Sequence, residues 1–221
     1  MFVGITSAPR KIPTLAHTIE CVRECGQEPR VFAEPGTSVP SSVKTIHNTS
    51  RLGIVKNWLS LCIHALDTES DLVVTLQDDV DLHPDTLDFV IEHKGNIQGL
   101  LGLYTSRYYG RGKQPGVHHI KTRHLWGACA LAFKKDTLAT IINHPRISSW
   151  GRDTGIDVLI GNIVNELELP MHFICPSPAS HIGKTSTVGH GGNEGNRNCA
   201  IQADKKIPLE KQIWPNLQLQ Q

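Results

Sequence analysis

The sequence predicts a single α/β domain built on a mostly parallel sheet. Short apolar runs of strand length alternate along the chain with segments whose apolar residues recur at helical spacing. Residues 72–76 form a continuous apolar run, which is typical of a central parallel strand buried on both faces. The alternation implies right-handed crossover connections, and 221 residues suffice for one sizeable core.

The first half of the chain shows this alternation most clearly. Residues 2–6 are expected to form a buried strand, residues 7–11 a loop, and residues 15–22 a helix that Gly26 ends. A second strand is expected over 30–33. A polar loop rich in Ser and Thr then leads to an amphipathic helix over 54–66, and the strand over 72–76 follows.

The second half is less regular. We expect a helix over 83–91, a strand over 99–104, a long polar loop over 106–123 and a strand over 126–133. Helices over 136–142 and 156–167 and a strand over 171–175 complete the domain. Residues 186–198 are rich in Gly and Asn, which predicts a mobile segment, and within it we expect residues 189–195 to form a lid.

Composition excludes several classes of protein. Lys and Arg total 22 against 21 acidic residues, and this net charge of +1 does not point to a polyanionic partner. The six cysteines contain no Cys-x-x-Cys pair, so we interpret them as reduced thiols of a cytosolic protein and not as disulfides or a zinc site. No segment resembles a signal peptide or a membrane span, so we expect a cytoplasmic protein without a membrane anchor.

The acidic cluster after residues 72–76 is the most informative segment for function. Asp78, Asp79 and Asp81 follow a predicted central strand, and open α/β sheets bind ligands at the carboxyl ends of their strands. Three neighbouring carboxylates repel one another unless a cation or a fixed donor compensates them. Hard divalent cations prefer such ligands and can also bridge a diphosphate. The alternative is a polar turn in which one Asp caps the next helix.

Several motifs together give the chain a resemblance to a known family. A short strand ends in Glu34, a helix carries Arg51, Lys56 and Asn57, and residues 77–81 read Gln-Asp-Asp-Val-Asp. Trp126-Gly127-Ala128, Gly155-Ile156-Asp157 and residues 176–187 follow. This order resembles the GT-A class of nucleotide-sugar glycosyltransferases, in particular small family-2-like enzymes of bacteria and phages. The acidic segment is similar to their Asp-x-Asp motif, with Gln77 in place of the usual first acidic residue, and the resemblance extends to about residue 205.

The resemblance implies a GT-A-like (Rossmann-like) fold with a mixed, mostly parallel sheet flanked by helices over residues 1–221. Residues 1–104 would bind the nucleotide-sugar, residues 105–205 the acceptor, and residues 206–221 would be a C-terminal tail. The donor would be of the UDP type. Its contacts would come from Thr6, Ser7, Ala8, Pro9, Arg10, Glu34, Arg51, Lys56, Asn57, Asp78, Lys184 and Thr185. Arg51 and Lys56 could equally be solvated charges at a helix start.

The resemblance also implies a divalent metal ion, Mn²⁺ or Mg²⁺. Asp79 would be its principal ligand, with Asp81 as the alternative and His181 as a further ligand. An imidazole suits manganese better than magnesium. The alternative for His181 is a histidine that only makes hydrogen bonds within a loop.

An inverting transferase needs a carboxylate that takes the proton of the acceptor hydroxyl. The resemblance places this base at Asp157 or Asp153, and we favour inversion over retention. Asp157 also begins a helix, where a carboxylate is favourable for structural reasons alone.

The acceptor is suggested by a stretch without acidic residues, from Thr105 to Lys135. Basic and aromatic side chains alternate in it, and the candidates for acceptor contact are Arg107, Tyr108, Arg111, Lys113 and Trp126. Basic residues neutralise phosphates and aromatic rings stack on bases, so DNA with hydroxymethylated bases is one acceptor hypothesis. A glycan or small molecule is the alternative, as is a solvated loop beside an anionic donor.

Together these inferences predict a metal-dependent glycosyltransferase that uses a nucleotide-sugar. Two rivals remain at this point. A nucleotidyltransferase would also use strand-end carboxylates with a divalent ion, but residues 7–11 lack the glycines of its signature loop. A non-catalytic nucleic-acid-binding module with a transferase fold is the other, since fold alone does not establish turnover.

Overall fold

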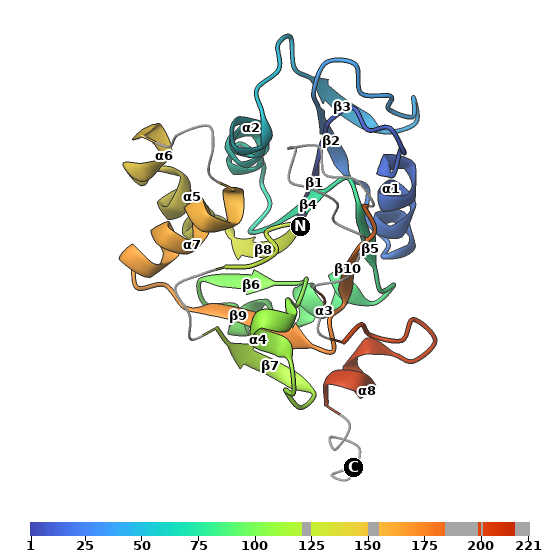
Figure 1. Cartoon of the computed structure of the whole chain (residues 1–221), viewed down its shortest axis with the longest axis vertical. Helices are drawn as coiled ribbons and strands as arrows, with labels where there is room; N and C mark the ends of the chain where they lie inside the picture. The colour runs from blue at the N-terminus through green and yellow to red at the C-terminus, as the bar shows by residue number, and fades with distance from the viewer. Residues whose placement is uncertain (121–124, 150–154, 184–198, 200, 215–221) are drawn as a thin grey trace.

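A computed structural model describes residues 1–120, 125–149, 155–183, 199 and 201–214 of the chain. Its centre is an eight-stranded sheet in the order β3-β2-β1-β4-β8-β6-β9-β7 (Figure 1). Only β8 and β7 run against the direction of the other strands. The bounds are β1 Phe2–Ser7, β2 Arg30–Ala33, β3 Lys44–His47, β4 Leu72–Gln77, β6 Leu100–Gly102, β7 Gly116–His119, β8 Ala130–Lys134 and β9 Met171–Cys175. The predicted mixed, mostly parallel α/β sheet flanked by helices is confirmed.

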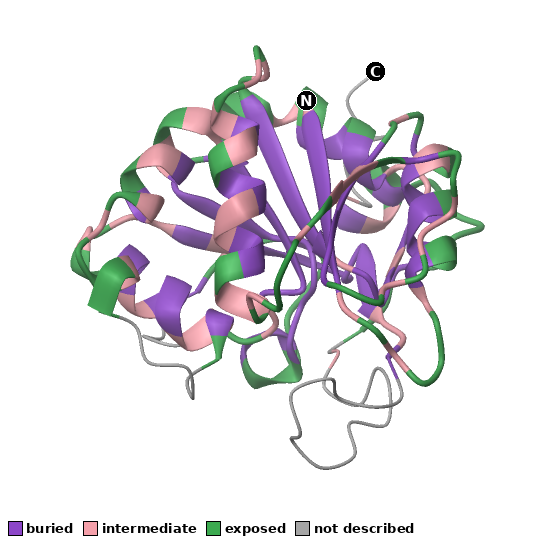
Figure 2. Cartoon of the chain, turned by 90° about the horizontal axis from the view of Figure 1, so that it is seen from above, coloured by how far each residue is buried: buried purple, intermediate pink, exposed green. Residues whose placement is uncertain are grey.

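Helices cover both faces of this sheet, and the strands between them are almost entirely buried (Figure 2). One core lies under α2 (Ile54–Leu66), α5 (Lys135–Ile142) and α7 (Ile156–Glu166). The other lies under α1 (Leu15–Glu24), α3 (Thr86–Glu92) and α8 (Leu209–Ile213). Thus, within the range 206–221 assigned to a tail, Leu209 and Ile213 are fully buried in a core. The remaining helices are short: α4 (Arg107–Gly110), α6 (Arg146–Ser149) and a 3₁₀ turn, Lys94–Asn96.

Strand side chains alternate between the two cores, as the pleat of a strand requires. In β4, Val74 packs toward α1 while Val73 packs toward α2. The neighbouring strand β8 places its small Ala132 on the α1 side and its large Phe133 on the α2 side. Both faces of the central strands are therefore filled, which explains why their sequences read as apolar throughout.

The predicted polar loop over 106–123 is wrong in part, because its residues form α4 and β7. β7 is the edge strand of the sheet and pairs only with β9. Its apolar Val117 is exposed, whereas its His118 stacks on Phe173 with 5.2 Å between the ring centroids. Such an edge strand lacks the apolar alternation on which the expectation depended. A second, two-stranded sheet was also not anticipated; it pairs β5 (Val80–Leu82) antiparallel with β10 (Ala179–His181).

The order of the strands creates a point at which the chain changes direction across the sheet. From β1 the chain moves to β2 and β3 on one side, and it then returns to β4 on the other side of β1. Connections that leave neighbouring strands in opposite directions open a crevice at their carboxyl ends. Gly4 lets α2 pack closely beside this point, because a Cβ there would lie 2.6 Å from the Leu61 side chain. None of the helices in the described part of the chain is long and apolar enough to cross a membrane.

Candidate functional site

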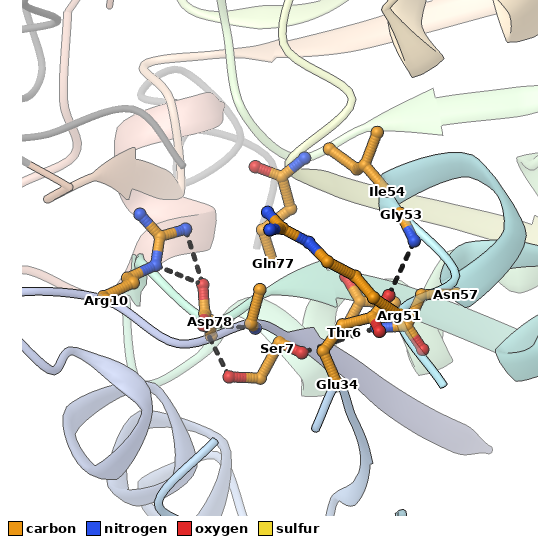
Figure 3. Close-up of a pocket in the computed structure, with 11 residues that line it drawn as sticks. Thr6, Ser7, Arg10, Glu34, Arg51, Gly53, Ile54, Asn57, Gln77 and Asp78 are labelled. Atoms are coloured by element: carbon orange, nitrogen blue, oxygen red, sulfur yellow. Dashed lines mark hydrogen bonds and ion pairs between the residues drawn. The ribbon is translucent and has the colours of Figure 1, made fainter. Parts of the chain in front are cut away.

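A pocket opens at the carboxyl ends of β1 and β4, where the chain changes direction (Figure 3). It encloses about 530 Å³, including the part open to solvent. Eight of the residues expected to contact the donor line it: Thr6, Ser7, Ala8, Arg10, Glu34, Arg51, Asn57 and Asp78. The structure thus brings together residues of β1 and α2 and residues that follow β2 and β4, which are far apart in the sequence.

Asp78 is the centre of a hydrogen-bond network at the pocket floor. Its Oδ2 accepts from Ser7 Oγ at 2.5 Å and from the Ala8 N–H at 3.3 Å, and its Oδ1 accepts from Arg10 Nε at 2.7 Å (Figure 3). Burial raises the pKa of Asp78 above its ordinary value, although the bonds from Arg10 and Ser7 oppose the rise. Asp78 therefore ties the loop after β1 to the end of β4.

Arg10 supplies the positive charge that the acidic residues need. Its Nη2 lies 2.6 Å from Asp78 Oδ1 and 2.8 Å from Asp79 Oδ2, and all three side chains are almost fully buried. Burial disfavours the guanidinium charge, but the two carboxylates outweigh that effect and raise the pKa of Arg10. The expected repulsion between neighbouring carboxylates is thus compensated within the chain.

Asp79 retains one oxygen that this arrangement does not use. Asp79 is 1% exposed, and its Oδ2 lies 2.8 Å from Arg10 and 2.9 Å from His181 Nε2. Its Oδ1 is buried and has no hydrogen-bond partner among the described residues. Gly183 allows the chain to pass close to this carboxylate, because a Cβ there would overlap with Asp79 Oδ2. A buried carboxylate oxygen without a partner, beside an imidazole, is a donor set that fits a divalent cation.

Glu34 lines the pocket, but its carboxylate accepts hydrogen bonds from backbone N–H groups. Glu34 is buried, and its oxygens accept from the N–H groups of Leu52 (2.9 and 3.1 Å) and Gly53 (2.8 Å). These donors lie where α2 begins, so the carboxylate also meets the positive end of the helix. Glu34 therefore fixes the segment that carries Arg51 over the pocket (Figure 3).

The other residues expected to contact the donor differ in their placement. Asn57 is buried and donates from Nδ2 to Phe32 O at 3.0 Å, which joins α2 to β2. Pro9 and Lys56 are exposed and are not among the residues that line the pocket. Lys184 and Thr185 lie outside the described residues, as does the whole of the expected mobile segment, 186–198.

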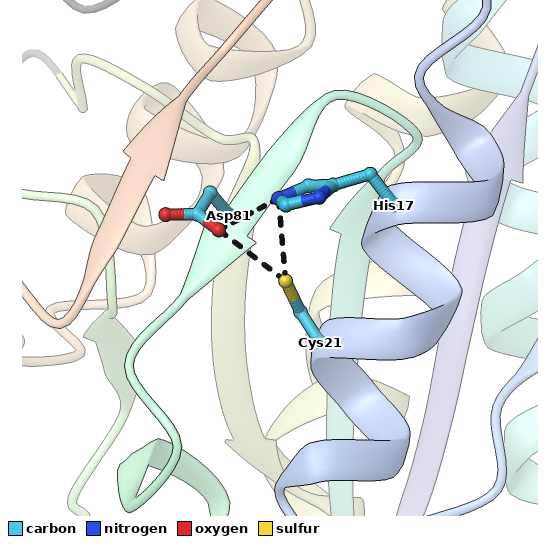
Figure 4. Close-up of side chains that lie close together, drawn as sticks. All are labelled: His17, Cys21 and Asp81. Atoms are coloured by element: carbon cyan, nitrogen blue, oxygen red, sulfur yellow. Dashed lines mark hydrogen bonds and ion pairs between the residues drawn. The ribbon is translucent and has the colours of Figure 1, made fainter. Parts of the chain in front are cut away.

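Asp81 is not brought together with Asp79 and His181. It lies in β5, and its Oδ1 is 2.7 Å from His17 Nε2 and 2.6 Å from Lys205 Nζ. Asp79 lies in the turn between β4 and β5, whereas Asp81 is the central residue of β5 and its side chain points toward α1 (Figure 4). Sequence spacing alone could not separate these two carboxylates.

Of the two candidate bases, the structure describes only Asp157; Asp153 lies outside the described residues. Asp157 is in the first turn of α7, half-buried, and its Oδ1 accepts from the Val158 N–H at 3.2 Å. The pKa of the Cys129 thiol is raised mainly by burial and additionally by both Asp79 and Asp157. Cys129 lies beside the end of β4, where the Gln77 N–H donates to Cys129 O.

Two of the expected acceptor residues form an exposed aromatic pair. The rings of Tyr108 and Trp126 lie 5.0 Å apart at 34°, with 58% and 39% of these residues exposed. Tyr109 holds the pair by donating from its hydroxyl to Trp126 O at 2.7 Å. Trp126 precedes β8, whose Ala130 pairs with Leu76 near the end of β4, so the pair lies at the same edge of the sheet as the pocket. Arg107, Arg111 and Lys113 are exposed beside it in sequence.

The pocket is also lined by three residues that were not predicted from the sequence as contacts: Gly53, Ile54 and Gln77. Gln77 was noted only as a departure from the acidic pattern. Gly53 adopts a φ of 80° at the start of α2, a conformation that favours glycine. An exposed glycine before an amphipathic helix is the signal that could have identified this position.

Comparison with solved structures shows the fold. A protein named a glucose-1-phosphate thymidylyltransferase from Bacillus anthracis, in complex with a sucrose, is 12% identical with a TM-score of 0.54, over 82% of this chain and 89% of that chain. HddC from Yersinia pseudotuberculosis is 11% identical with a TM-score of 0.52, over 82% and 94%. GalNAc-T7 with UDP, GalNAc and Mn²⁺ is 11% identical with a TM-score of 0.57 over 81% of this chain, which spans 43% of that chain.

No protein-family model and no curated protein sequence matches the chain. At 11–12% identity, the likeness to solved structures establishes the Rossmann-like, GT-A type of fold and leaves the activity to be argued from the site.

Proposed function

We propose that this chain is a metal-dependent glycosyltransferase that moves a sugar from a nucleotide-sugar, of the UDP type, to an acceptor hydroxyl. The observation that carries the proposal is the buried Oδ1 of Asp79, which lacks a hydrogen-bond partner among the described residues and lies beside His181, next to a pocket at the carboxyl ends of β1 and β4. Ligands of open α/β sheets bind at such a position. Two of the similar structures bear the names of enzymes or complexes with nucleotide or sugar ligands, which agrees with the proposal.

The pocket would bind the nucleotide part of the donor. The nucleoside would lie between the end of β1 and the start of α2, against Thr6, Gly53 and Asn57. The diphosphate would lie toward Arg10 and Arg51, the cationic side chains of the lining. Bidentate guanidinium groups suit the oxygens of a phosphate better than a point charge does.

Asp79 and His181 would hold the divalent cation, which would offset the charge of the departing nucleoside diphosphate. Of the two Asp79 oxygens, Arg10 contacts Oδ2, so a ligand at Oδ1 would not break that ion pair. Arg10 would also keep Asp78 ionised and in place while the donor binds.

Asp157 would act as the base of an inverting reaction. The acceptor oxygen would bond to the anomeric carbon as the bond from that carbon to the diphosphate breaks, and the electron pair would leave with the diphosphate. The acceptor proton would pass to the Asp157 carboxylate, which lies at the N-terminal end of α7. Asp153 is the second candidate for this role, since it belongs to the same segment of the sequence.

The acceptor would contact the aromatic pair of Tyr108 and Trp126. Exposed aromatic faces stack on nucleobases and on the apolar faces of sugar rings. The nearby positive charges of Arg107, Arg111 and Lys113 favour an acceptor that carries phosphates, and DNA with a hydroxymethylated base is the specific acceptor that we propose. A glycan or small-molecule acceptor is the alternative.

A panel of nucleotide-sugars tests the donor and the metal together. With Mn²⁺ present, UDP-sugars should raise the melting temperature and be hydrolysed or transferred, and a chelator should abolish turnover. Asp79→Ala should lower turnover by roughly 10³-fold or more, because a bound cation contributes several kcal/mol to transition-state stabilisation. The variant should still fold, since Arg10 keeps its ion pair with Asp78.

Asp88→Ala is the control, because Asp88 is an exposed carboxylate in the first turn of α3. Full wild-type turnover in excess chelator would contradict the metal-dependent mechanism.

A nucleotidyltransferase is the second candidate, favoured by Arg10, which follows β1 and faces two strand-end carboxylates. A guanidinium there could equally stabilise an α-phosphate under attack by a sugar phosphate. The two activities differ in their products. Incubation of a nucleoside triphosphate with a sugar 1-phosphate would release pyrophosphate only from a nucleotidyltransferase, whereas a glycosyltransferase would release a nucleoside diphosphate from the nucleotide-sugar.

A further inference from the structure

A second cluster of potential metal ligands lies apart from the pocket, between α1 and β5. His17 Nε2 is 2.7 Å from Asp81 Oδ1, and Cys21 Sγ is 3.4 Å from His17 Nε2 and 3.3 Å from Asp81 Oδ1 (Figure 4). A nitrogen, a sulfur and an oxygen thus face one common point, each within 4.8 Å of the others.

The fold brings these three residues together from two elements. His17 and Cys21 are four residues apart in α1, so they lie on one face of the helix. Asp81 is the central residue of β5, and its side chain points toward that face (Figure 4). Cys21 is buried, Asp81 is partly buried, and the His17 side chain is 51% exposed. A ligand can therefore reach the cluster from the solvent side of His17.

We propose that His17, Cys21 and Asp81 form a binding site for a thiophilic divalent cation, with Zn²⁺ as the ion that fits best. Thiolate, imidazole and carboxylate are the three ligand types that zinc accepts in proteins. In a tetrahedral zinc site, the usual bond lengths place sulfur about 3.6 Å from nitrogen or oxygen, and nitrogen about 3.4 Å from oxygen. The two distances that involve Cys21 Sγ are within about 0.3 Å of these values, and the closer His17–Asp81 pair must separate by about 0.7 Å.

The sequence argued against zinc because no Cys-x-x-Cys pair is present. The absence of a Cys-x-x-Cys pair excludes only zinc sites that are built from paired cysteines. The present cluster needs only one cysteine, because its other ligands come from one helical turn away and from a strand 60 residues further along the chain.

The ammonium group of Lys205 would compete with a metal ion for Asp81. Its Nζ lies 2.6 Å from Asp81 Oδ1, the same oxygen that contacts His17. The ammonium group balances the carboxylate without a metal, and an incoming cation must displace it from that oxygen. Removal of this charge should therefore strengthen metal binding.

Occupancy of the site would connect α1 to the small sheet, which contains His181 and directly follows Asp79. β5 follows directly on Asp79, and Asp81 pairs with Ser180 in β10, next to His181. A metal bound to residues of both α1 and β5 would restrain this sheet. The site is distinct from that of Asp79, so the proposal does not depend on the transferase reaction.

Titration of the reduced, metal-free protein with Co²⁺ tests the proposal, because a thiolate bound to Co²⁺ gives a charge-transfer absorption that oxygen and nitrogen ligands do not. We expect one equivalent to produce this band together with tetrahedral d–d bands, and Zn²⁺ to displace the Co²⁺. Cys21→Ser should abolish the charge-transfer band, and His17→Gln should weaken affinity at least tenfold. Lys205→Met should tighten binding.

Cys25→Ser is the matched control, because Cys25 is also buried in the same segment but donates to His83 O at 3.4 Å, away from the cluster. It should keep the band, as should Asp79→Ala, in which only the proposed catalytic site is lost. Absence of the band in the wild-type protein, or its persistence in Cys21→Ser, would overturn the proposal.

If Cys21→Ser does not fold, X-ray absorption of the zinc-loaded wild-type protein decides instead. One sulfur at about 2.3 Å with nitrogen and oxygen ligands supports the site, and a shell without sulfur overturns it.

Discussion

Arg10 shows how one residue can decide the electrostatics of a site. Asp78 and Asp79 are consecutive, buried carboxylates, and such a pair is costly unless a positive charge is close. Arg10 reaches both with one nitrogen, so the free protein holds its acidic motif without a metal ion. The guanidinium and a metal ion would then share the task of neutralising these residues and the donor diphosphate.

Arg10→Ala tests this role. Removing one partner of a buried ion pair typically costs about 3–5 kcal/mol, so the variant should unfold at a lower urea concentration than the wild type. Mn²⁺ should raise the melting temperature of Arg10→Ala more than that of the wild type, because the carboxylates then lack another cation. Lys11→Ala, an exposed neighbour, is the control. An equal effect of Mn²⁺ on both proteins would argue against a cation site at these carboxylates.

Asp157→Asn tests the proposed base. The amide keeps the shape of the side chain but cannot take the proton, so transfer should fall by about 10²–10⁴-fold while donor affinity stays unchanged. Asp136→Asn is a matched control, because Asp136 is an exposed carboxylate in the first turn of α5. Wild-type transfer rates in Asp157→Asn would shift the role to Asp153. Retention of the anomeric configuration in the product would rule out the mechanism.

At the scale of the elements, the pocket depends on how α2 is attached to the sheet. Asn57 bonds to the end of β2, and Glu34, which follows β2, binds the backbone at the start of the helix. Both residues were expected to contact the donor. In the structure their polar atoms form hydrogen bonds that hold the wall of the pocket in place. The sequence position of a polar residue near a strand end does not distinguish this structural role from ligand binding.

Glu34→Gln tests the attachment. The amide offers one acceptor oxygen where the carboxylate offers two, and it brings an NH₂ group toward backbone N–H donors. Hydrogen bonds to charged groups contribute about 1.5–3 kcal/mol, so we expect a loss of about 2 kcal/mol in the free energy of unfolding measured in urea. Donor binding should weaken as well, because the segment that carries Arg51 loses its anchor. Glu28→Gln, an exposed carboxylate, should change neither quantity. Unchanged stability in Glu34→Gln would show that these bonds do not hold α2.

Secondary structure was predictable where burial gives a clear pattern. The central strands and the helices α1, α2, α5 and α7 bury a continuous face, so their apolar residues recur with the period of the element. β3, β5, β7 and β10 were missed because they are short and lie at sheet edges or in the small sheet. Their stability comes from pairing with neighbouring strands, which leaves little trace in a local sequence pattern.

At the scale of the whole molecule, charge is distributed unevenly although the total is nearly balanced. The chain carries a net charge of +1, yet the exposed Arg107, Arg111 and Lys113 follow one another closely in the sequence around Tyr108. A local excess of positive charge is what a phosphate-bearing acceptor would need.

The salt dependence of DNA binding tests this arrangement. Each phosphate that the protein neutralises releases counterions, so affinity for duplex DNA should fall steeply as the salt concentration rises. Joint replacement of Arg107, Arg111 and Lys113 by Ala should reduce the slope of log K against log salt by about 3, roughly 1 for each charge. Hydrolysis of the nucleotide-sugar should persist. A triple Ala variant of the exposed Lys44, Lys94 and Lys211 is the control.

Labelled donor and a set of acceptors complete this test. Transfer to DNA that contains hydroxymethylcytosine or hydroxymethyluracil, and not to unmodified DNA, is the expected result. Label found only in a sugar acceptor would reject DNA and leave the transferase proposal in place.

The sequence by itself determined the fold class and the position of the pocket, because periodic burial specifies the central elements and parallel strands bring their carboxyl ends to one edge. Eight of the residues that the resemblance assigned to donor contact line this pocket. Only the tertiary structure decided which partners the acidic residues Asp78, Asp79 and Asp81 contact. Asp78 and Asp79 meet Arg10 in the site, while Asp81 turns toward His17 and Cys21. Asp78 and Asp79 lie in the turn after β4 and Asp81 lies in β5, and only the packing of α1 and β10 around β5 settles which partner each carboxylate receives.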